Sequence, residues 1–323
     1  METNTFFSAK RLAAIAIAVC TAIGFTSCSS DNEQTGEVPP PTSKNGEFTV
    51  NDNGLKVYFA PGNLQATYDG SNWTWAFAAN QWEYIGGYDG NSPYHNNTGN
   101  NYINGIGTMS KNGTVDLFGW VGASCEWTGV AMYGISNATW GGRNQYGNKP
   151  VESLKSDWGN LITNSNTVWR TLTKDEWIYV LYRRRASTVN GISNACYTKA
   201  TVVGNAGVIL FPDSYIHPED VKSPFNINAE EAAFTDNNYN AAAWGKLEAA
   251  GCAFLPAAGS RDGSYVIDHK DYPCGYYWSS TPDPGVLGRW GADMVHFDNN
   301  CLYASEYSSR YYGYSVRLVR QSK

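Results

Sequence analysis

The sequence predicts an α+β domain that contains more strand than helix. Residues 47–78 alternate apolar and polar side chains around two turn dipeptides, Asn53–Gly54 and Asp69–Gly70, which is typical of antiparallel hairpins. The clearest helix signal is a capping sequence with helical apolar spacing in residues 169–184. After it, short apolar runs are separated by glycine, proline and polar residues up to the C-terminus, as expected for further strands.

The N-terminal segment has the parts of an export signal: a short basic stretch, an apolar run over residues 12–25 and small residues up to Cys28. The run is too short for a permanent membrane span, so residues 1–27 are predicted to be a signal peptide. The stretch "FTSC" resembles a bacterial lipobox, which implies lipidation of Cys28. An ordinary secretory peptide with an incidental cysteine is the alternative. Residues 28–46 are polar and proline-rich, which predicts a flexible linker.

Charge and the residue after the lipobox cysteine favour particular partners and a location. Ser29 follows Cys28, a pattern that resembles outer-membrane delivery and surface display in Gram-negative lipoproteins. The formal net charge is −6, and it becomes −7 without residues 1–27, which contain Lys10 and Arg11 against Glu2. Because the acidic chain has no basic run, it is a poor candidate for binding nucleic acid.

The helix expected after residue 169 begins with a capping box, in which Thr173 and Glu176 each accept from the other's backbone N–H. Its buried face would consist of Trp177, Val180 and Leu181. Residues 183–185 are arginines, which would place cations at the helix C-terminus. A second short helix is expected over residues 239–250. Residues 86–149 are rich in Gly and Asn, which indicates long ordered loops held by aromatic anchors.

Cysteine and histidine patterns argue against a cofactor or a metal site. After removal of the signal and lipidation of Cys28, five cysteines remain: Cys125, Cys196, Cys252, Cys274 and Cys301. An odd number without framework spacing favours buried free thiols. The four histidines form no HExxH, HxH or Cys/His motif, and the glycines of "GNAG" at residues 204–207 are expected to form a turn. Calcium binding by Asp283, Asp293 and Asp298 is a weaker alternative, and hydrolysis by a pair of these carboxylates is a weaker one still.

Two stretches resemble a known superfamily. "WRTLTKDEW" resembles the "RLPTEAEWEYA" helix of formylglycine-generating enzymes, and "GYSVRLVR" resembles their closing "GFRLVR" strand. With "YYWSS" and "FAPGNLQ", residues 47–320 resemble exported lipoproteins of the Fibrobacter-succinogenes-major-paralogous-domain type. The resemblance implies one C-type-lectin-like domain over residues 47–323. That enzyme's activity would need closely spaced copper-binding cysteines, whereas Cys274 and Cys301 are 27 residues apart, so no enzyme is predicted.

The resemblance also implies that the C-terminal strands and loops carry the ligand face, which diversity-generating retroelements rewrite in some members. Tyr, Ser, Gly and Asn are enriched there, as in recognition surfaces, because tyrosine offers a rigid ring and a hydroxyl. The tyrosines are expected to be exposed, whereas Trp278, Val295, Phe297, Val316 and Leu318 are expected in the core. The predicted ligand-binding residues are Asp283, Arg289, His296, Asp298, Asn299, Tyr303, Tyr307, Ser309, Tyr311, Tyr312 and Tyr314.

The function predicted from these features is non-enzymatic binding of a protein or glycan on another cell, a phage or a host surface. The composition of residues 276–318 fits diversification of template adenines, because they contain no Lys or Gln and only one Glu. An ordinary binding surface of the same composition is the alternative. Two other functions stay open: an enzyme on the same scaffold with an unrecognised site, and a structural adhesin subunit.

Overall fold

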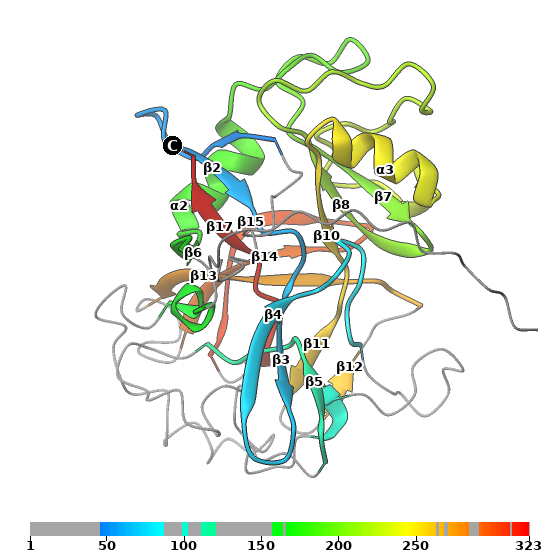
Figure 1. Ribbon diagram of the computed structural model, residues 1–323. Helices are drawn as coiled ribbons and strands as arrows, with labels where there is room; N and C mark the ends of the chain where they lie inside the picture. The colour runs from blue at the N-terminus through cyan, green and yellow to red at the C-terminus, as the bar shows by residue number, and fades with distance from the viewer. Residues whose placement is uncertain are drawn as a thin grey trace, which may run out of the picture. The chain divides into compact units, whose positions relative to one another are not determined.

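Five small sheets and two short α-helices make up the described part of the chain in the computed structural model (Figure 1). The described residues are 46–86, 99–102, 111–120, 157–163, 166–262, 265–267, 271–283, 291–310 and 312–322. The prediction of an α+β domain with more strand than helix is confirmed for these residues. None of the helices among them is long and apolar enough to cross a membrane.

The first and last strands of the domain share one sheet, in the order β1-β2-β17-β6. The strands are β1 (Phe48–Thr49), β2 (Lys56–Phe59), β17 (Leu318–Gln321) and β6 (Trp169–Thr171). The predicted hairpin at Asn53–Gly54 is confirmed, because Gly54 adopts a φ of +77° between β1 and β2. The pairing of β17 with β2 therefore closes the chain onto its own beginning (Figure 1).

The second predicted hairpin forms a sheet of its own, in the order β4-β3-β5. Its elements are β3 (Leu64–Tyr68), β4 (Trp73–Phe77) and β5 (Gly113–Val115), and the short 3-10 helix η1 spans Gly99–Tyr102. The turn at Asp69–Gly70 is confirmed. The Asp69 carboxylate accepts from the backbone N–H groups of Ser71 and Asn72, which is the usual role of aspartate in a tight turn.

A third sheet, β10-β8-β7-β9, packs against the second helix. Its elements are β10 (Ala253–Pro256), β8 (Asn205–Leu210), β7 (Tyr197–Val202), β9 (Asn238–Tyr239), η7 (Phe234–Asp236) and α3 (Ala241–Ala249). The helix expected over residues 239–250 is confirmed and lies beside β7 and β8 (Figure 1). Its Trp244 and Leu247 are buried against the sheet. Val203 and Gly204 have positive φ at the β7–β8 turn, so the turn interpretation of "GNAG" is also confirmed.

The capped helix is α2 (Lys174–Ile178), which continues into one π-helical turn, η6 (Tyr179–Arg183). The short 3-10 helix η5 spans Trp158–Leu161. The capping box is confirmed: Glu176 N–H donates to Thr173 Oγ1 at 3.2 Å, and Thr173 N–H donates to Glu176 Oε2 at 2.9 Å. Trp177, Val180 and Leu181 are buried, as predicted. They pack on the core that includes Phe59.

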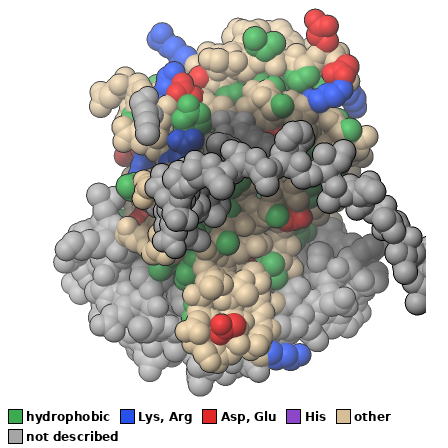
Figure 2. Space-filling model, viewed as in Figure 1, with side chains coloured by type: hydrophobic (Ala, Val, Ile, Leu, Met, Phe, Trp, Pro, Cys, Tyr) green, Lys and Arg blue, Asp and Glu red, His purple; other side chains and the backbone are tan. Residues whose placement is uncertain are grey.

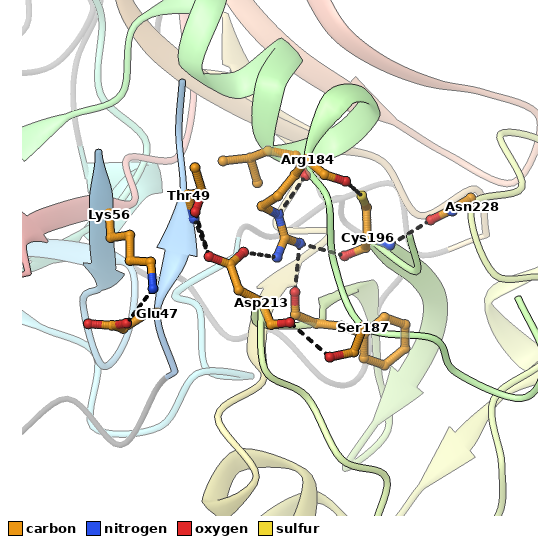
Figure 3. Close-up of polar contacts among 10 residues, drawn as sticks. Glu47, Thr49, Lys56, Arg184, Ser187, Cys196, Asp213 and Asn228 are labelled. Carbon is orange, nitrogen blue, oxygen red and sulfur yellow. Dashed lines mark hydrogen bonds and ion pairs between the residues drawn. The ribbon is translucent and has the colours of Figure 1, made fainter. Parts of the chain in front are cut away.

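The arginine after η6 has a role that the sequence did not indicate. The sequence predicts Arg184 to be a cation at the helix end, but its side chain is fully buried. It makes polar contacts with residues of other segments (Figure 3). Its Nη1 pairs with Asp213 Oδ1 at 2.9 Å, and Nη2 donates to the Phe211 carbonyl at 2.6 Å. Asp213 Oδ2 in turn accepts from the backbone and hydroxyl of Thr49. This network ties β1, η6 and the end of β8 together.

The C-terminal strands form the sheet β13-β14-β15, and a smaller sheet has the order β12-β11-β16. Their bounds are β13 (Gly275–Asp283), β14 (Gly291–Phe297), β15 (Leu302–Ser309), β11 (Ser260–Asp262), β12 (Tyr265–Ile267) and β16 (Tyr312–Gly313). Both faces of the larger sheet are covered: Val295 and Phe297 join the core of α2, whereas Trp278 and Met294 join a second core. The five residues predicted to be core are all fully buried.

The described cysteines are free thiols, and side chains of different types are mixed on the surface (Figure 2). Cys196, Cys252 and Cys274 are buried free thiols, as predicted, and Cys301 is a partly exposed one. Cys125 lies outside the described residues. On the face drawn in Figure 2, the coloured hydrophobic, acidic and basic side chains are scattered over the surface.

Candidate functional site

The candidate site is a row of aromatic rings on one face of the β13-β14-β15 sheet. Directly opposed residues of antiparallel strands point to the same face. Tyr276 on β13 is opposed to His296 on β14, and His296 is opposed to Tyr303 on β15. The three rings therefore cross the sheet side by side.

Two tyrosines of the closing segment extend this row into an aromatic ladder of Tyr303, His296, Tyr276, Tyr314 and Tyr312. The centroid separations are 4.6 Å for Tyr276 and His296, 4.8 Å for Tyr276 and Tyr314, and 6.0 Å for Tyr312 and Tyr314. In each of these pairs the two ring planes are within 15° of parallel. The ring centroids of Tyr303 and His296 are 6.2 Å apart, and their planes are tilted. Tyr303 is 48% exposed at one end, Tyr312 is partly exposed at the other, and Tyr314 is buried. The ladder thus presents its ends to solvent, whereas Tyr314 is buried and His296 and Tyr276 are half-buried.

The prediction that Tyr314 is exposed is wrong. It was expected to turn outward at a bend after Gly313, but its backbone pairs with Phe118 and its ring points inward. Gly313 serves packing instead, because a Cβ there would meet the Arg261 Cβ at 2.9 Å. The Tyr314 hydroxyl lies 2.8 Å from Ser308 Oγ, and burial raises the pKa of this phenol. Its ring cannot contact a ligand in this arrangement.

The two tyrosines of β15 are exposed to similar extents but lie on opposite faces of the sheet. Tyr303, 48% exposed, is opposed to His296, whereas Tyr307, 47% exposed, is opposed to Asp293. An irregularity in the pairing between Met294 and His296 inserts one extra residue into β15 and reverses its side-chain alternation. Only Tyr303 therefore belongs to the ladder face.

Polar groups surround the exposed end of the ladder. His296 Nδ1 lies 2.8 Å from Glu306 Oε2, whose side chain is 41% exposed. Asp298 Oδ1 accepts from the backbone N–H groups of Asn300 and Cys301 and so shapes the β14–β15 turn. Burial acts to raise the pKa of Asp298, but these hydrogen bonds outweigh it and hold the pKa below its usual value. A charged carboxylate is therefore available beside the imidazole.

A thiol joins these groups from β13. Gly275 is opposed to Phe297, so the residue before Gly275 comes opposite the residue after Phe297, which brings Cys274 to Asp298. One donor atom from each of Cys274, His296 and Asp298 lies within 4.8 Å of the other two. Cys274 is buried, and its Sγ donates to the Tyr272 carbonyl at 3.1 Å. Burial, with a further contribution from the Asp298 charge, raises the pKa of this thiol to about 11.

Two other predicted site residues lie away from this end of the sheet. Asp283 and Ser309 are both opposed to Gly291, at the far end of β14. At about 3.3 Å per residue, that end is roughly 17 Å from His296. Asn299 is in the turn, where its side-chain oxygen accepts from Phe234 N–H at 3.1 Å. The remaining predicted residues, Arg289, Tyr311 and the lipidation residue Cys28, lie outside the described residues.

Four residues of the site were missed in the sequence: Tyr272, Cys274, Tyr276 and Glu306. The spacing of His296 and Asp298, two residues apart on an expected strand, could have indicated that they share a face. No local signal indicated that Cys274 joins them, because that depends on the pairing of β13 with β14. Tyr272 is 76% exposed beside Cys274 and adds a second solvent-facing ring.

No family model matches the chain, and no curated protein or solved structure matches it.

Proposed function

We propose that this protein is a non-enzymatic, lipid-anchored binding protein that contacts a protein or glycan ligand through the exposed end of the aromatic ladder. The observation that carries the proposal is the juxtaposition of the Tyr303 ring with His296, Glu306 and Asp298. A flat aromatic face can stack on a sugar ring or an apolar side chain. The neighbouring carboxylates and imidazole can accept and donate hydrogen bonds to hydroxyl or amide groups.

Preorganisation favours binding at this place. Tyr276 stacks on one face of the His296 ring with an interplanar angle of 7°, and Glu306 Oε2 lies 2.8 Å from Nδ1 at the edge of the same ring. The groups are therefore held in position before a ligand arrives, which reduces the entropy lost on binding. Tyrosine adds to this effect because it has few rotatable bonds for its contact area.

The proposed fold is C-type-lectin-like. It is supported by the residues that resemble that superfamily and by their contacts. The α2 stretch contacts each strand of the ligand-face sheet: Lys174 N–H donates to Thr281 Oγ1, its Nζ lies 3.1 Å from Asp293 Oδ1, and Tyr182 donates to the Leu302 carbonyl. The stretch with the second resemblance supplies Tyr314 to the ladder and the closing strand β17. Both stretches thus contact the sheet that carries the proposed binding face, α2 from the opposite side and Tyr314 within the ladder.

The proposed location is the outer membrane of a Gram-negative bacterium, with the domain facing the cell exterior. This rests on the lipobox-like "FTSC" and on the polar linker of residues 28–46. Membrane fractionation of Cys28→Ser tests the anchor. The variant should appear in the soluble fraction, and unchanged membrane association would contradict the proposal.

Tyr303→Ala tests the binding face, and Tyr307→Ala is its matched control. Both tyrosines are exposed to the same degree, but only Tyr303 lies on the ladder face. We expect Tyr303→Ala to weaken binding by about 1–3 kcal/mol in a glycan-array or cell-adhesion assay, and Tyr307→Ala to bind like the parent protein. Both variants should keep the parental melting temperature. Equal binding by the two variants, or loss only in Tyr307→Ala, would place the ligand face elsewhere.

A further inference from the structure

We propose that Cys274, His296 and Asp298 form a binding site for one zinc ion. The three side chains offer a sulfur, a nitrogen and an oxygen donor, with one atom of each within 4.8 Å of the others. These are the three donor types that bind zinc in proteins. The proposal goes beyond ligand binding at the aromatic ladder and does not depend on it.

The strand pairing holds the three donors on one side of the sheet. His296 is on β14, and Asp298 follows it by two residues, so the two side chains lie on the same side of the chain. Cys274 immediately precedes β13 and comes opposite Asp298 in the register of the two strands. Gly275 fixes this approach, because a Cβ at that position would meet the buried Phe297 ring at 2.1 Å. The packing of the core therefore positions the Cys274 thiol close to the other two donors.

The histidine has the surroundings of a metal ligand. Its Nδ1 lies 2.8 Å from Glu306 Oε2, whereas its Nε2 is buried and has no hydrogen-bond partner among the described residues. A buried ring nitrogen without a partner is uncommon in proteins, because its lost hydration is not replaced. Metal-binding histidines commonly use one nitrogen for the metal and the other for a carboxylate. In this arrangement Nε2 would bind the metal, and the Glu306 carboxylate would hold the other ring nitrogen, Nδ1.

The donor set selects the type of metal. Calcium and magnesium prefer oxygen ligands, whereas a thiolate with an imidazole suits zinc. Donors around one tetrahedral zinc are roughly 3.3–3.7 Å apart, so the three groups have to approach by about 1 Å. Rotation of the Cys274 and Asp298 side chains, which lie at the start of a strand and in a turn, would supply this movement. Three protein ligands leave a fourth position for water or for a donor atom of a bound molecule.

A neighbouring thiol provides an internal control. Cys301 Sγ lies 4.0 Å from His296 Nδ1, which is the ring nitrogen that contacts Glu306. Cys301 is not one of the three clustered donors. If zinc is bound as proposed, Cys301→Ser should leave the affinity unchanged. If zinc is bound nonspecifically by accessible thiols, this variant should lose as much as Cys274→Ser.

The experiment is a metal titration of the purified, chelator-treated protein, with Zn²⁺ measured by equilibrium dialysis and Co²⁺ used as a spectroscopic probe. The parent protein should bind one equivalent and should show thiolate-to-cobalt charge-transfer absorption. Cys274→Ser should lose that absorption, and Asp298→Asn should weaken zinc binding while its amide oxygen still accepts in the turn. Glu306→Gln should weaken binding by about 10–100-fold, as expected of an outer partner.

Two results would overturn the proposal: a parent protein that binds less than one equivalent of zinc, or equal losses in Cys301→Ser and Cys274→Ser. Circular dichroism of each metal-free variant checks folding, and Glu306→Gln is the safest variant because its side chain is half exposed. Tyr303→Ala separates this proposal from the binding function. It should keep zinc affinity whether or not it loses adhesion.

Discussion

Replacement of Asp213 by asparagine tests whether the buried ion pair with Arg184 stabilises the fold. The Arg184 side chain is fully buried and Asp213 is 13% exposed, so neither group is well hydrated in the folded state. Asp213→Asn keeps the size of the side chain but removes the charge that compensates the guanidinium. Removal of one partner of a buried pair costs about 3–5 kcal/mol, because the other charge stays buried without compensation.

The hydrogen bonds around the pair do not remove this cost. The asparagine oxygen can accept either from Arg184 or from Thr49, whereas the two aspartate oxygens accept from both. For a domain of this size, the loss corresponds to a fall in melting temperature of roughly 6–20 °C. Lys56→Gln is the control, because Lys56 and Glu47 form a neighbouring ion pair whose side chains are 44% and 36% exposed (Figure 3). That pair should contribute about 0–1 kcal/mol.

The assay is urea unfolding followed by tryptophan fluorescence, with the slope m compared among the variants. We expect an unchanged m and a lower midpoint for Asp213→Asn only. A loss below about 1 kcal/mol, or a loss equal to that of Lys56→Gln, would refute the reasoning that the buried charge requires its partner.

Three further predictions concern the helix, a buried carboxyl group and a strand contact. Trp177→Ala should lower the free energy of unfolding by about 3–5 kcal/mol and Thr173→Ala by about 1 kcal/mol, so equal small losses in urea unfolding would contradict the burial of the indole. Burial raises the pKa of Asp116 to about 6 in the folded protein, from 3.8, so this group binds protons more tightly in the folded state. The contribution of Asp116 to the free energy of unfolding should therefore fall by up to about 3 kcal/mol as pH rises from about 4 to 6. In melting curves measured at several pH values, Asp116→Asn should show a smaller change of stability with pH over this range. Gly275→Ala should destabilise the protein by about 1–3 kcal/mol, because the new Cβ would overlap the Phe297 ring; a parental melting temperature would show that the strands can separate freely.

Local features of the fold could be predicted from the sequence because their causes lie within a few residues. The capping box needs only Thr173 and Glu176, three positions apart, and it is present. The turn at Asn53–Gly54 needs a residue that tolerates positive φ, and Gly54 supplies it. Alternation of side chains along an extended segment placed Val316 and Leu318 in the core. Each of these signals is read from neighbours in the chain.

The candidate site depends on contacts between distant segments, and there the sequence was insufficient. The orientation of Tyr314 is decided by the packing of Gly313 against Arg261, 52 residues earlier. The opposite faces of Tyr303 and Tyr307 result from one extra residue in a strand pairing, which no composition or period indicates. Side chains of one strand alternate by themselves, but the partner strand decides the register, and the register decides which side chains meet.

The residues that carry the chemistry illustrate both contributions. The sequence by itself determined that tyrosine is concentrated near the C-terminus, and it placed His296 and Asp298 two residues apart. Only the tertiary structure brought Cys274 to them and stacked Tyr276 on the imidazole. The physical reason is that cross-strand hydrogen bonds and the packing of Gly275 on Phe297 set the distance between segments that the chain separates by more than twenty residues.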